Sequence, residues 1–404
     1  MLFKPYTLPC GVTVKNRFFK GAMSEGLASP TYFPTNQLYS LYETWADGEI
    51  GVVVTGNVMV DKRALGEPRN VVVESDEVRP YLEKWAESGT KNNTQLWMQL
   101  NHPGKQVFKG VVSDSVAPSA IPFEGSLGRF FPPPRALNSL EIKEIIHRFG
   151  YSAKLAKISG FTGVQIHAAH GYLLSQFLSP THNQREDEWG GSIDNRCRLL
   201  IEVFREIRTQ TGSDFPISVK LNSTDFQKAG FSEDDSLYVA HRLHQEGVDL
   251  LELSGGTYES PVMTGVVKDS TREREAYFLE FAETLRKESS LPLAVTGGFR
   301  TKEGMMEAVL SGATDFIGMA RPLAVYPDYP LKVLNGENQN IVISEKRTGI
   351  KTIDQSAMLE MTWYAQQLER LSKGKNPKPN FPVFLSLIKS LLKNGNEIFG
   401  SRRS

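Results

Sequence analysis

The 404-residue chain carries 46 basic and 46 acidic side chains, and this neutral balance argues against a nucleic-acid binder that depends on phosphate attraction. Its two cysteines, Cys10 and Cys197, are too few for a metal cluster or a disulfide framework, which indicates a reducing compartment. The sequence shows no signal peptide and no run near the roughly 20 apolar residues of a membrane span. We therefore expect a cytoplasmic protein with no nucleic-acid partner and no integral membrane segment.

The first predicted element is a small hairpin, in which Tyr6–Leu8 and Val12–Val14 flank a Pro-Cys-Gly turn. After it, short apolar segments alternate with longer amphipathic ones, which indicates parallel strand–helix units. The expected strands are Phe18–Met23, Gly51–Thr55, Gln95–Leu100, Gly163–His167, Ile217–Leu221, Asp249–Leu253, Leu293–Thr296 and Asp315–Met319.

Helices are expected between these strands, near residues 37–46, 79–88, 140–159, 195–210, 233–246, 273–288, 302–311 and 323–334. In the third of them, Leu140, Ile145, Phe149, Leu155 and Ala156 recur at helical spacing and predict a stripe that faces the core. Eight strand–helix repeats favour a (β/α)8 TIM barrel. A doubly wound sheet would instead call for a G-x-G-x-x-G turn after an early strand, which the sequence lacks.

Two long insertions interrupt the repeat, Asn101–Ser139 after the third strand and Ser254–Arg272 after the sixth. Both follow strand ends at which barrel enzymes place substrate loops, so we expect them to act as lids. The first carries Phe123, Phe130, Phe131 and three consecutive prolines, which suits a semi-rigid cover over a hydrophobic pocket. The alternative is that the insertion is a surface loop without a functional role.

The repeat stops near residue 335, so we expect a barrel domain over residues 1–335 and a C-terminal extension over 336–404. The extension carries a predicted helix at Gln355–Ser372, a linker with the sequence GKNPKPNFP, and a second amphipathic segment at Val383–Leu392. Lys389 and Lys393 make the polar side of that segment basic. It could contact a membrane surface, but we expect the extension to pack on the barrel or on a second subunit of a homo-oligomer.

One strand end is rich in groups that donate or accept protons. It lies in the segment GVQIHAAHGYLLSQFLSPTHNQR, in which a buried apolar run is followed by His167, His170 and Tyr172. In a barrel, polar residues at the carboxyl ends of strands carry the function, so we expect the active site here. Other strand ends contribute Ser24, Gly56, Gln99, Asn101, His102, Lys220, Asn222 and Ser254.

The last two strand ends, with Gly298 and Arg321, predict a phosphate site, because barrels commonly bind phosphate there. Such a face suits a phosphorylated planar cofactor and a small substrate with a polar head. Three alternatives stay open: the two histidines could bind a metal, Lys220 could form a Schiff base as in barrel aldolases, or the barrel could be non-catalytic. The sequence offers no evident third metal ligand.

The segment HAAHGYLLSQFLSPTHNQREDEWGGSIDNRCRLLIEV resembles the central motif of the Old Yellow Enzyme family, whose members are FMN-dependent NAD(P)H oxidoreductases. The resemblance runs from about Leu2 to Pro330 and includes KNRFFKGAMSE, WMQLNHPGKQ, VTGGFRT and FIGMARPL. It implies a (β/α)8 barrel that holds non-covalent FMN at the carboxyl ends of its strands, with NAD(P)H as reductant.

The resemblance also implies an ene-reductase activity, in which activated alkenes with a carbonyl or nitro group are reduced. His167 and His170 match the pair that holds the substrate's oxygen, and Tyr172 matches the acid that protonates the alkene carbon. A flavin-dependent oxidative demethylase or an NADH oxidase on the same barrel is the alternative.

For the cofactor, the resemblance implies that Gln99 binds the pyrimidine edge of the flavin and that Lys220 replaces the usual arginine beside N1 and O2. Ser24 stands where relatives carry threonine or cysteine, so the flavin's redox potential does not carry over. Gly26 stands where one branch of the family has a tyrosine. The remaining expected cofactor contacts are Ala22, Met23 and Gly56 at the flavin's rim and Gly298, Ala320 and Arg321 at its phosphate.

Overall fold

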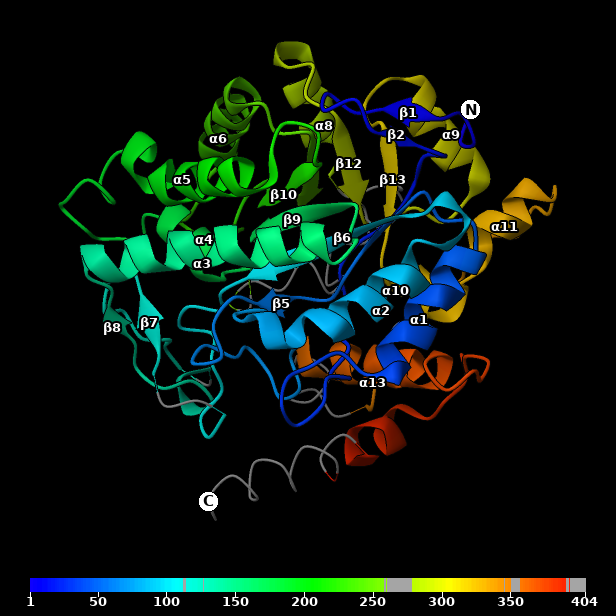
Figure 1. Ribbon diagram of the computed structural model, residues 1–404, viewed down its shortest axis with the longest axis horizontal. Helices are drawn as coiled ribbons and strands as arrows, with labels where there is room; N and C mark the ends of the chain where they lie inside the picture. Colours follow the sequence, from blue (N-terminus) through cyan, green and yellow to red (C-terminus); the bar gives the residue numbers. More distant parts are fainter. Residues whose placement is uncertain are drawn as a thin grey trace.

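Eight parallel strands close into a barrel in the computed structural model, and helices surround them (Figure 1). The barrel strands are β3 (Phe18–Lys20), β4 (Val52–Val54), β6 (Gln95–Asn101), β9 (Gly163–Ala168), β10 (Ile217–Asn222), β11 (Leu250–Ser254), β12 (Leu293–Thr296) and β13 (Phe316–Met319). Each pairs in parallel with its neighbour, and the β3–β4 and β4–β6 pairings close the ring between β13 and β9. The structure describes residues 1–111, 114–125, 127–257, 259, 278–344, 346–349, 357–389 and 392.

The predicted (β/α)8 fold is confirmed, and all eight predicted strands form. Their residues are almost all buried, as expected for apolar parallel strands that helices cover on the outside. The largest difference lies in β3, which ends at Lys20 rather than Met23. The residues after it leave the sheet and turn towards the pocket described below.

Helices also form in every interval between strands in which they were expected, and all but the last agree with the prediction wherever the structure describes them. They are α1 (Asn36–Asp47), α2 (Arg79–Gly89), α3 (Ser139–Ile158), α5 (Ile193–Thr211), α6 (Glu233–Glu246), α8 (Leu279–Glu288), α9 (Lys302–Leu310), α10 (Arg321–Val325) and α11 (Tyr329–Leu334). The single helix predicted over 323–334 is wrong, because two short helices replace it. Pro327 disfavours the helical conformation at Tyr326, so the chain breaks there and begins again with Pro330 in the first turn of α11.

Other elements lie outside the eight strand–helix repeats. They are β1 (Tyr6–Thr7), β2 (Thr13–Val14), β5 (Val58–Met59), β7 (Val116–Ala117), β8 (Arg135–Ala136), α4 (Leu173–Leu178), α13 (Ala357–Leu371) and three 3₁₀ turns at Asp76–Val78, Lys91–Asn93 and Leu127–Arg129. The β1–β2 pair is the predicted N-terminal hairpin. Leu8 and Val14 join a buried cluster with barrel residues such as Phe19, Trp97 and Phe316, so the hairpin seals one end of the barrel with apolar side chains.

None of the described residues in the insertion after β6 lines the pocket. Phe123 and Phe131 are buried, with ring centroids 5.0 Å apart, and Phe108 lies 4.8 Å from Phe131. Phe130 is exposed. Phe108, Phe123 and Phe131 thus pack within the insertion itself. The expectation that Phe123, Phe130 and Phe131 cover the pocket is wrong for the described residues. Most of the insertion after β11 lies outside the described residues.

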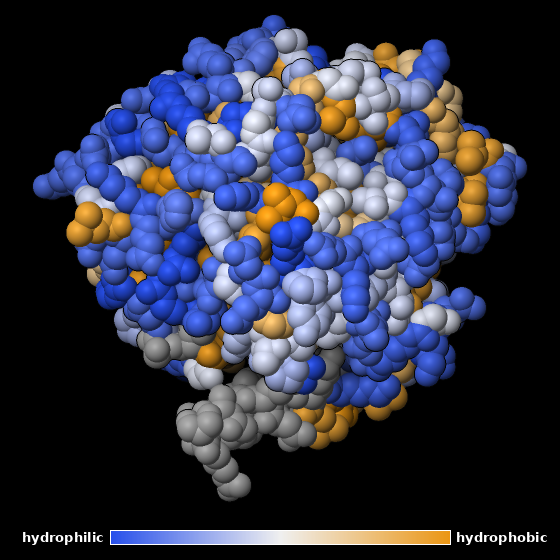
Figure 2. All heavy atoms as spheres, in the orientation of Figure 1, coloured by the Kyte–Doolittle hydropathy of each residue, from blue (hydrophilic) through white to orange (hydrophobic). Residues whose placement is uncertain are grey.

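In the C-terminal extension, α13 contacts α1 and α10, as Figure 1 shows below those helices. The indole of Trp363 is buried and donates to the Phe381 carbonyl at 3.0 Å, while Lys346 Nζ lies 3.7 Å from its ring centroid. A further helix over residues 383–389 is more exposed, with Phe384 and Leu385 open to solvent. Figure 2 shows hydrophobic atoms at this lower edge of an otherwise largely hydrophilic face.

The packing stripe of α3 differs from the expectation at its first position. Asn138 caps the helix by accepting from the N–H groups of Leu140 and Glu141, and this first turn projects beyond the core. Leu140 is therefore 79% exposed, while Ile145 and Phe149 are buried.

We expect Phe149→Ala to lower the free energy of unfolding by about 3–5 kcal/mol, because the substitution opens a cavity beneath α3. Leu140→Ala on the same helix is the control and should change it by no more than about 0.5 kcal/mol. Guanidinium denaturation followed by circular dichroism measures both values. Equal effects of the two substitutions would contradict the packing described for α3.

Candidate active site

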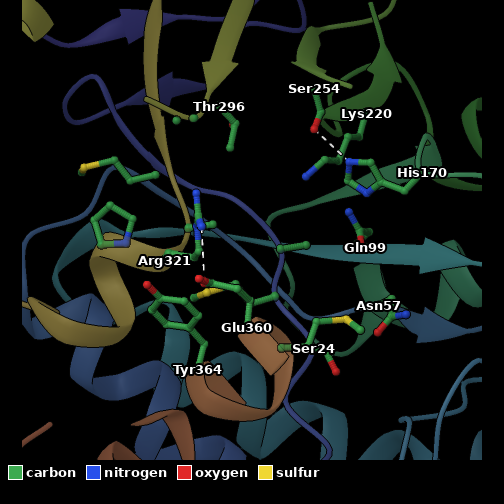
Figure 3. Close-up of a pocket in the computed structure, with 18 of the residues that line it drawn as sticks. Ser24, Asn57, Gln99, His170, Lys220, Ser254, Thr296, Arg321, Glu360 and Tyr364 are labelled. Carbon is green, nitrogen blue, oxygen red and sulfur yellow. Dashed lines mark hydrogen bonds and ion pairs between the residues drawn. The ribbon is translucent and has the colours of Figure 1, made fainter. Parts of the chain in front are cut away.

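A single pocket at the carboxyl ends of the strands brings together most of the predicted site residues (Figure 3). Gly56 and the strand-end residues Asn101, His102 and Asn222 do not line it. The predicted residues that line it are Ala22, Met23, Ser24, Gln99, His167, His170, Tyr172, Lys220, Gly298, Ala320 and Arg321. Residues that the sequence analysis did not assign also line it, among them Asn57, Glu67, Phe278, Thr296, Glu360, Met361 and Tyr364. The pocket therefore takes side chains from the barrel and from the C-terminal helix.

Gly56 lies behind the pocket rather than in its wall. Its N–H donates to the Tyr42 hydroxyl at 2.9 Å, and that hydroxyl in turn donates to Glu25. A Cβ at this position would lie 2.7 Å from the Met23 carbonyl oxygen. The glycine thus permits the close approach of the loop that carries Met23 into the pocket.

His167 is positioned as a neutral hydrogen-bond donor. Burial, with a smaller contribution from the Lys220 ammonium, lowers the pKa of His167 well below its usual value. Its Nδ1 accepts the N–H of Ala169 at 3.3 Å, so the proton of the neutral ring resides on Nε2. The imidazole stands nearly perpendicular to the Tyr172 ring, with centroids 4.8 Å apart.

His170 is held by bonds to three other segments. Its backbone adopts φ +61°, a left-handed conformation that a non-glycine residue keeps only under strong constraint. Its N–H donates to Asn222 Oδ1 at 3.3 Å, and its carbonyl accepts from Gln106 Nε2 at 2.9 Å. Its Nε2 lies 2.8 Å from the Ser254 hydroxyl, as Figure 3 shows. Burial, followed by Lys220 and His167, lowers the pKa of His170.

Lys220 points into the pocket from β10 and forms an ion pair with Glu252, at 3.0 Å. This carboxylate is fully buried and also accepts from Gln165 Nε2 at 2.9 Å and Thr296 Oγ1 at 2.7 Å. Gln165 in turn accepts from Gln99 Nε2 at 2.7 Å. Glu252 was not among the predicted site residues, although a lone carboxylate within the apolar strand Leu250–Ser254 is a signal in the sequence.

Ser24 also has an acidic partner that the sequence did not indicate. Its hydroxyl donates to the Glu67 carboxylate, and burial raises the pKa of that carboxyl. Glu67 belongs to the segment between β5 and the first 3₁₀ turn and lines the pocket beside Asn57.

The opposite end of the pocket carries the residues expected to hold phosphate. Gly297 and Gly298 have φ values of 116° and 98°, which favour glycine and leave the backbone without side chains at this point. Arg321 begins α10, and its Nη1 lies 3.4 Å from Glu360 Oε2 of α13. The sequence analysis did not anticipate a pocket residue from the C-terminal helix.

Within the described residues, no group of three or more histidine, cysteine or acidic side chains is arranged to hold a metal ion. None of the described helices is both long and apolar enough to cross a membrane.

The buried histidines predict a loss of stability in mild acid. Burial lowers the pKa of His102 from its ordinary 6.5 to about 4, and the pKa values of His167 and His170 also fall. Below pH 6.5 these histidines bind protons in the unfolded chain but remain neutral in the folded chain. Stability should therefore fall as the pH drops from 6.5 towards 4, with each histidine adding a slope of up to about 1.4 kcal/mol per pH unit.

Urea denaturation between pH 7 and pH 4.5 measures this slope. The matched variant His102→Gln should show a shallower slope than the wild-type chain. Identical slopes for the two proteins would show that His102 does not contribute to the pH dependence of stability.

Comparisons with known proteins agree with this geometry. The family model described as "NADH:flavin oxidoreductase / NADH oxidase family" matches residues 1–340. The NADH-dependent flavin oxidoreductase iliE of Hypocrea jecorina (strain QM6a) is 38% identical over 355 residues, which cover 82% of this chain and 88% of that protein.

Two solved structures share the fold. The old yellow enzyme homologue from Zymomonas mobilis is 26% identical, with a TM-score of 0.72 over 85% of this chain and 95% of that one. A 2-naphthoyl-CoA reductase in complex with 2-naphthoyl-CoA is 26% identical, with a TM-score of 0.77 over 84% of this chain. The present chain spans only 53% of that reductase.

The comparisons support a flavin and a nicotinamide reductant rather than the Schiff-base chemistry of a barrel aldolase. The chain belongs to the Old Yellow Enzyme family of NADH:flavin oxidoreductases.

Proposed function

We propose that the protein uses FMN and NAD(P)H to reduce the activated C=C bond of α,β-unsaturated carbonyl or nitro compounds. The observation that carries this proposal is the arrangement at the end of β9. There a neutral imidazole of His167, with its proton on Nε2, lies against the ring of Tyr172 in a pocket also lined by His170. Two donors and an acid on one side of a pocket match the polarisation and protonation of an activated alkene.

The pocket residues fit a flavin that carries a phosphate. Lys220 and Gln99 supply an ammonium and an amide at one end, where a flavin presents its polar pyrimidine edge. Gly298 and Arg321 supply open backbone and a guanidinium at the other end, where the phosphate would lie. Met23 and Phe278 add apolar surface to the pocket lining. FMN bound here supplies the hydride for the reaction.

The chain's own residues then act on the substrate. His167 Nε2–H donates to the carbonyl or nitro oxygen, and His170 contributes the second polar contact, while Ser254 holds its ring in place. Both imidazoles are neutral because of their lowered pKa values, so neither carries a positive charge next to Lys220. Tyr172 delivers the proton to the α carbon of the alkene.

An oxidative demethylase or NADH oxidase activity would use the same pocket, and the matched family includes NADH oxidases by its description. A panel of enones, nitroalkenes and N-methylated amines, with oxygen as a further acceptor, separates these activities. Turnover of amines or oxygen without any turnover of alkenes would reject the proposed reaction.

We expect Tyr172→Phe to slow the reduction of an enone by about 10²–10⁴-fold, because the proton donor is lost. Bleaching of the flavin by NAD(P)H should keep its wild-type rate. Stopped-flow absorbance measures the two half-reactions separately. An equal loss in both half-reactions would show that Tyr172 is not the acid.

We expect the double variant His167→Ala, His170→Ala to bind phenolic ligands to the oxidised enzyme at least roughly ten-fold more weakly, because a charged oxygen loses its donors. Titration of the flavin absorbance change with a substituted phenol gives the Kd. Ser254→Ala alone should cause a smaller loss, since both imidazoles remain. Unchanged affinity in the double variant would reject the two-histidine clamp.

A further inference from the structure

The C-terminal helix α13 forms part of the pocket wall through Glu360, Met361 and Tyr364. These residues lie beyond residue 340, where the family match ends. The helix contacts α10, which begins with Arg321, and Figure 3 shows Glu360 and Tyr364 beside that arginine. The end of the pocket assigned above to phosphate therefore has a wall that lies outside the family-model match.

Tyr364 places a hydroxyl group without a hydrogen-bond partner among the described residues in this wall. The residue is 5% exposed, and its hydroxyl is buried with no hydrogen-bond partner among the described residues. Its ring is fixed edge-on against Trp363, with centroids 4.9 Å apart. Burial raises the pKa of Tyr364, so the hydroxyl keeps its proton and remains a donor. A buried hydroxyl without a partner costs about 1–3 kcal/mol, which a ligand that accepts its hydrogen bond would offset.

The charges around Tyr364 indicate which acceptor fits. Among the charged groups, Glu360 acts most strongly on the Tyr364 hydroxyl, and Arg321 and Arg300, which also line the pocket, act on it in the opposite sense. The backbone N–H of Lys346 donates to Glu360 Oε1 at 3.3 Å. Glu360 also contacts Arg321, so it links α13 to the guanidinium. A small anion with several acceptor oxygens suits a hydroxyl donor that shares its pocket with two guanidinium groups.

We propose that Tyr364 is a cofactor-binding residue that donates its O–H to the phosphate group of the bound FMN, while Glu360 positions Arg321 beside the same phosphate. The proposal rests on the proposed function, since it takes FMN as the ligand. It makes the C-terminal helix a determinant of cofactor choice, because a riboflavin without phosphate gains nothing from this hydroxyl.

The test compares FMN and riboflavin on the full-length chain after removal of its flavin. Quenching of flavin fluorescence gives a Kd for each flavin with the wild-type chain, Tyr364→Phe and Thr362→Ala. We expect Tyr364→Phe to weaken FMN binding by roughly ten-fold or more while riboflavin binding stays unchanged. Thr362→Ala is the matched control, because its hydroxyl bonds to the Leu359 carbonyl on the same helix and does not line the pocket.

Two outcomes would overturn the proposal. One is an unchanged FMN affinity in Tyr364→Phe, and the other is an equal loss for FMN and riboflavin, which would place Tyr364 away from the phosphate. Unchanged riboflavin binding in the variant also shows that its pocket is folded. A wild-type chain that binds neither flavin would overturn the proposed function itself, which distinguishes that failure from a failure of Tyr364 alone.

Discussion

The site depends on one buried carboxylate, that of Glu252 on β11. It bonds to Lys220 of β10, Gln165 of β9 and Thr296 of β12, and so joins four strands within the barrel. Removing one partner of a buried ion pair typically costs about 3–5 kcal/mol, because the other charge remains without compensation. Lys220, and through Gln165 also Gln99, therefore depend on an acid that does not itself line the pocket.

The two ends of the barrel interior differ in polarity, and this difference places the chemistry. The hairpin and residues such as Phe19 and Trp97 fill one end with apolar side chains. The carboxyl end holds Lys220 and the two histidines instead. Three basic groups can share this space because burial and the ammonium keep both imidazoles neutral. The histidines act as donors there without adding charge.

The sequence was sufficient for the barrel, because apolar runs mark buried strands. Polar residues at the strand ends, together with the family resemblance, indicated part of the pocket lining. His167, His170 and Tyr172 lie so close along the chain that one strand end brings them together. Longer-range pairings were not predictable in this way. The contacts of Glu252 join segments up to 87 residues apart, and Glu360 meets Arg321 across 39 residues. Pro327 indicates the break between α10 and α11, but the residues on both sides of it have helical spacing and therefore predicted one continuous helix.

The hydrogen bonds that end at Glu252 also have a direction. Gln99 Nε2 donates to Gln165, and Gln165 Nε2 donates to the carboxylate. An ionised carboxylate only accepts, so it fixes which way each amide along this path is turned. The nitrogen of Gln99 is thereby drawn into the barrel, and its carbonyl oxygen becomes the atom best placed to accept from a ligand. A molecule that bonds to this oxygen must bring an N–H or O–H of its own. The negative charge of Glu252 on β11 thus determines that Gln99 on β6 accepts a hydrogen bond from the ligand rather than donating one.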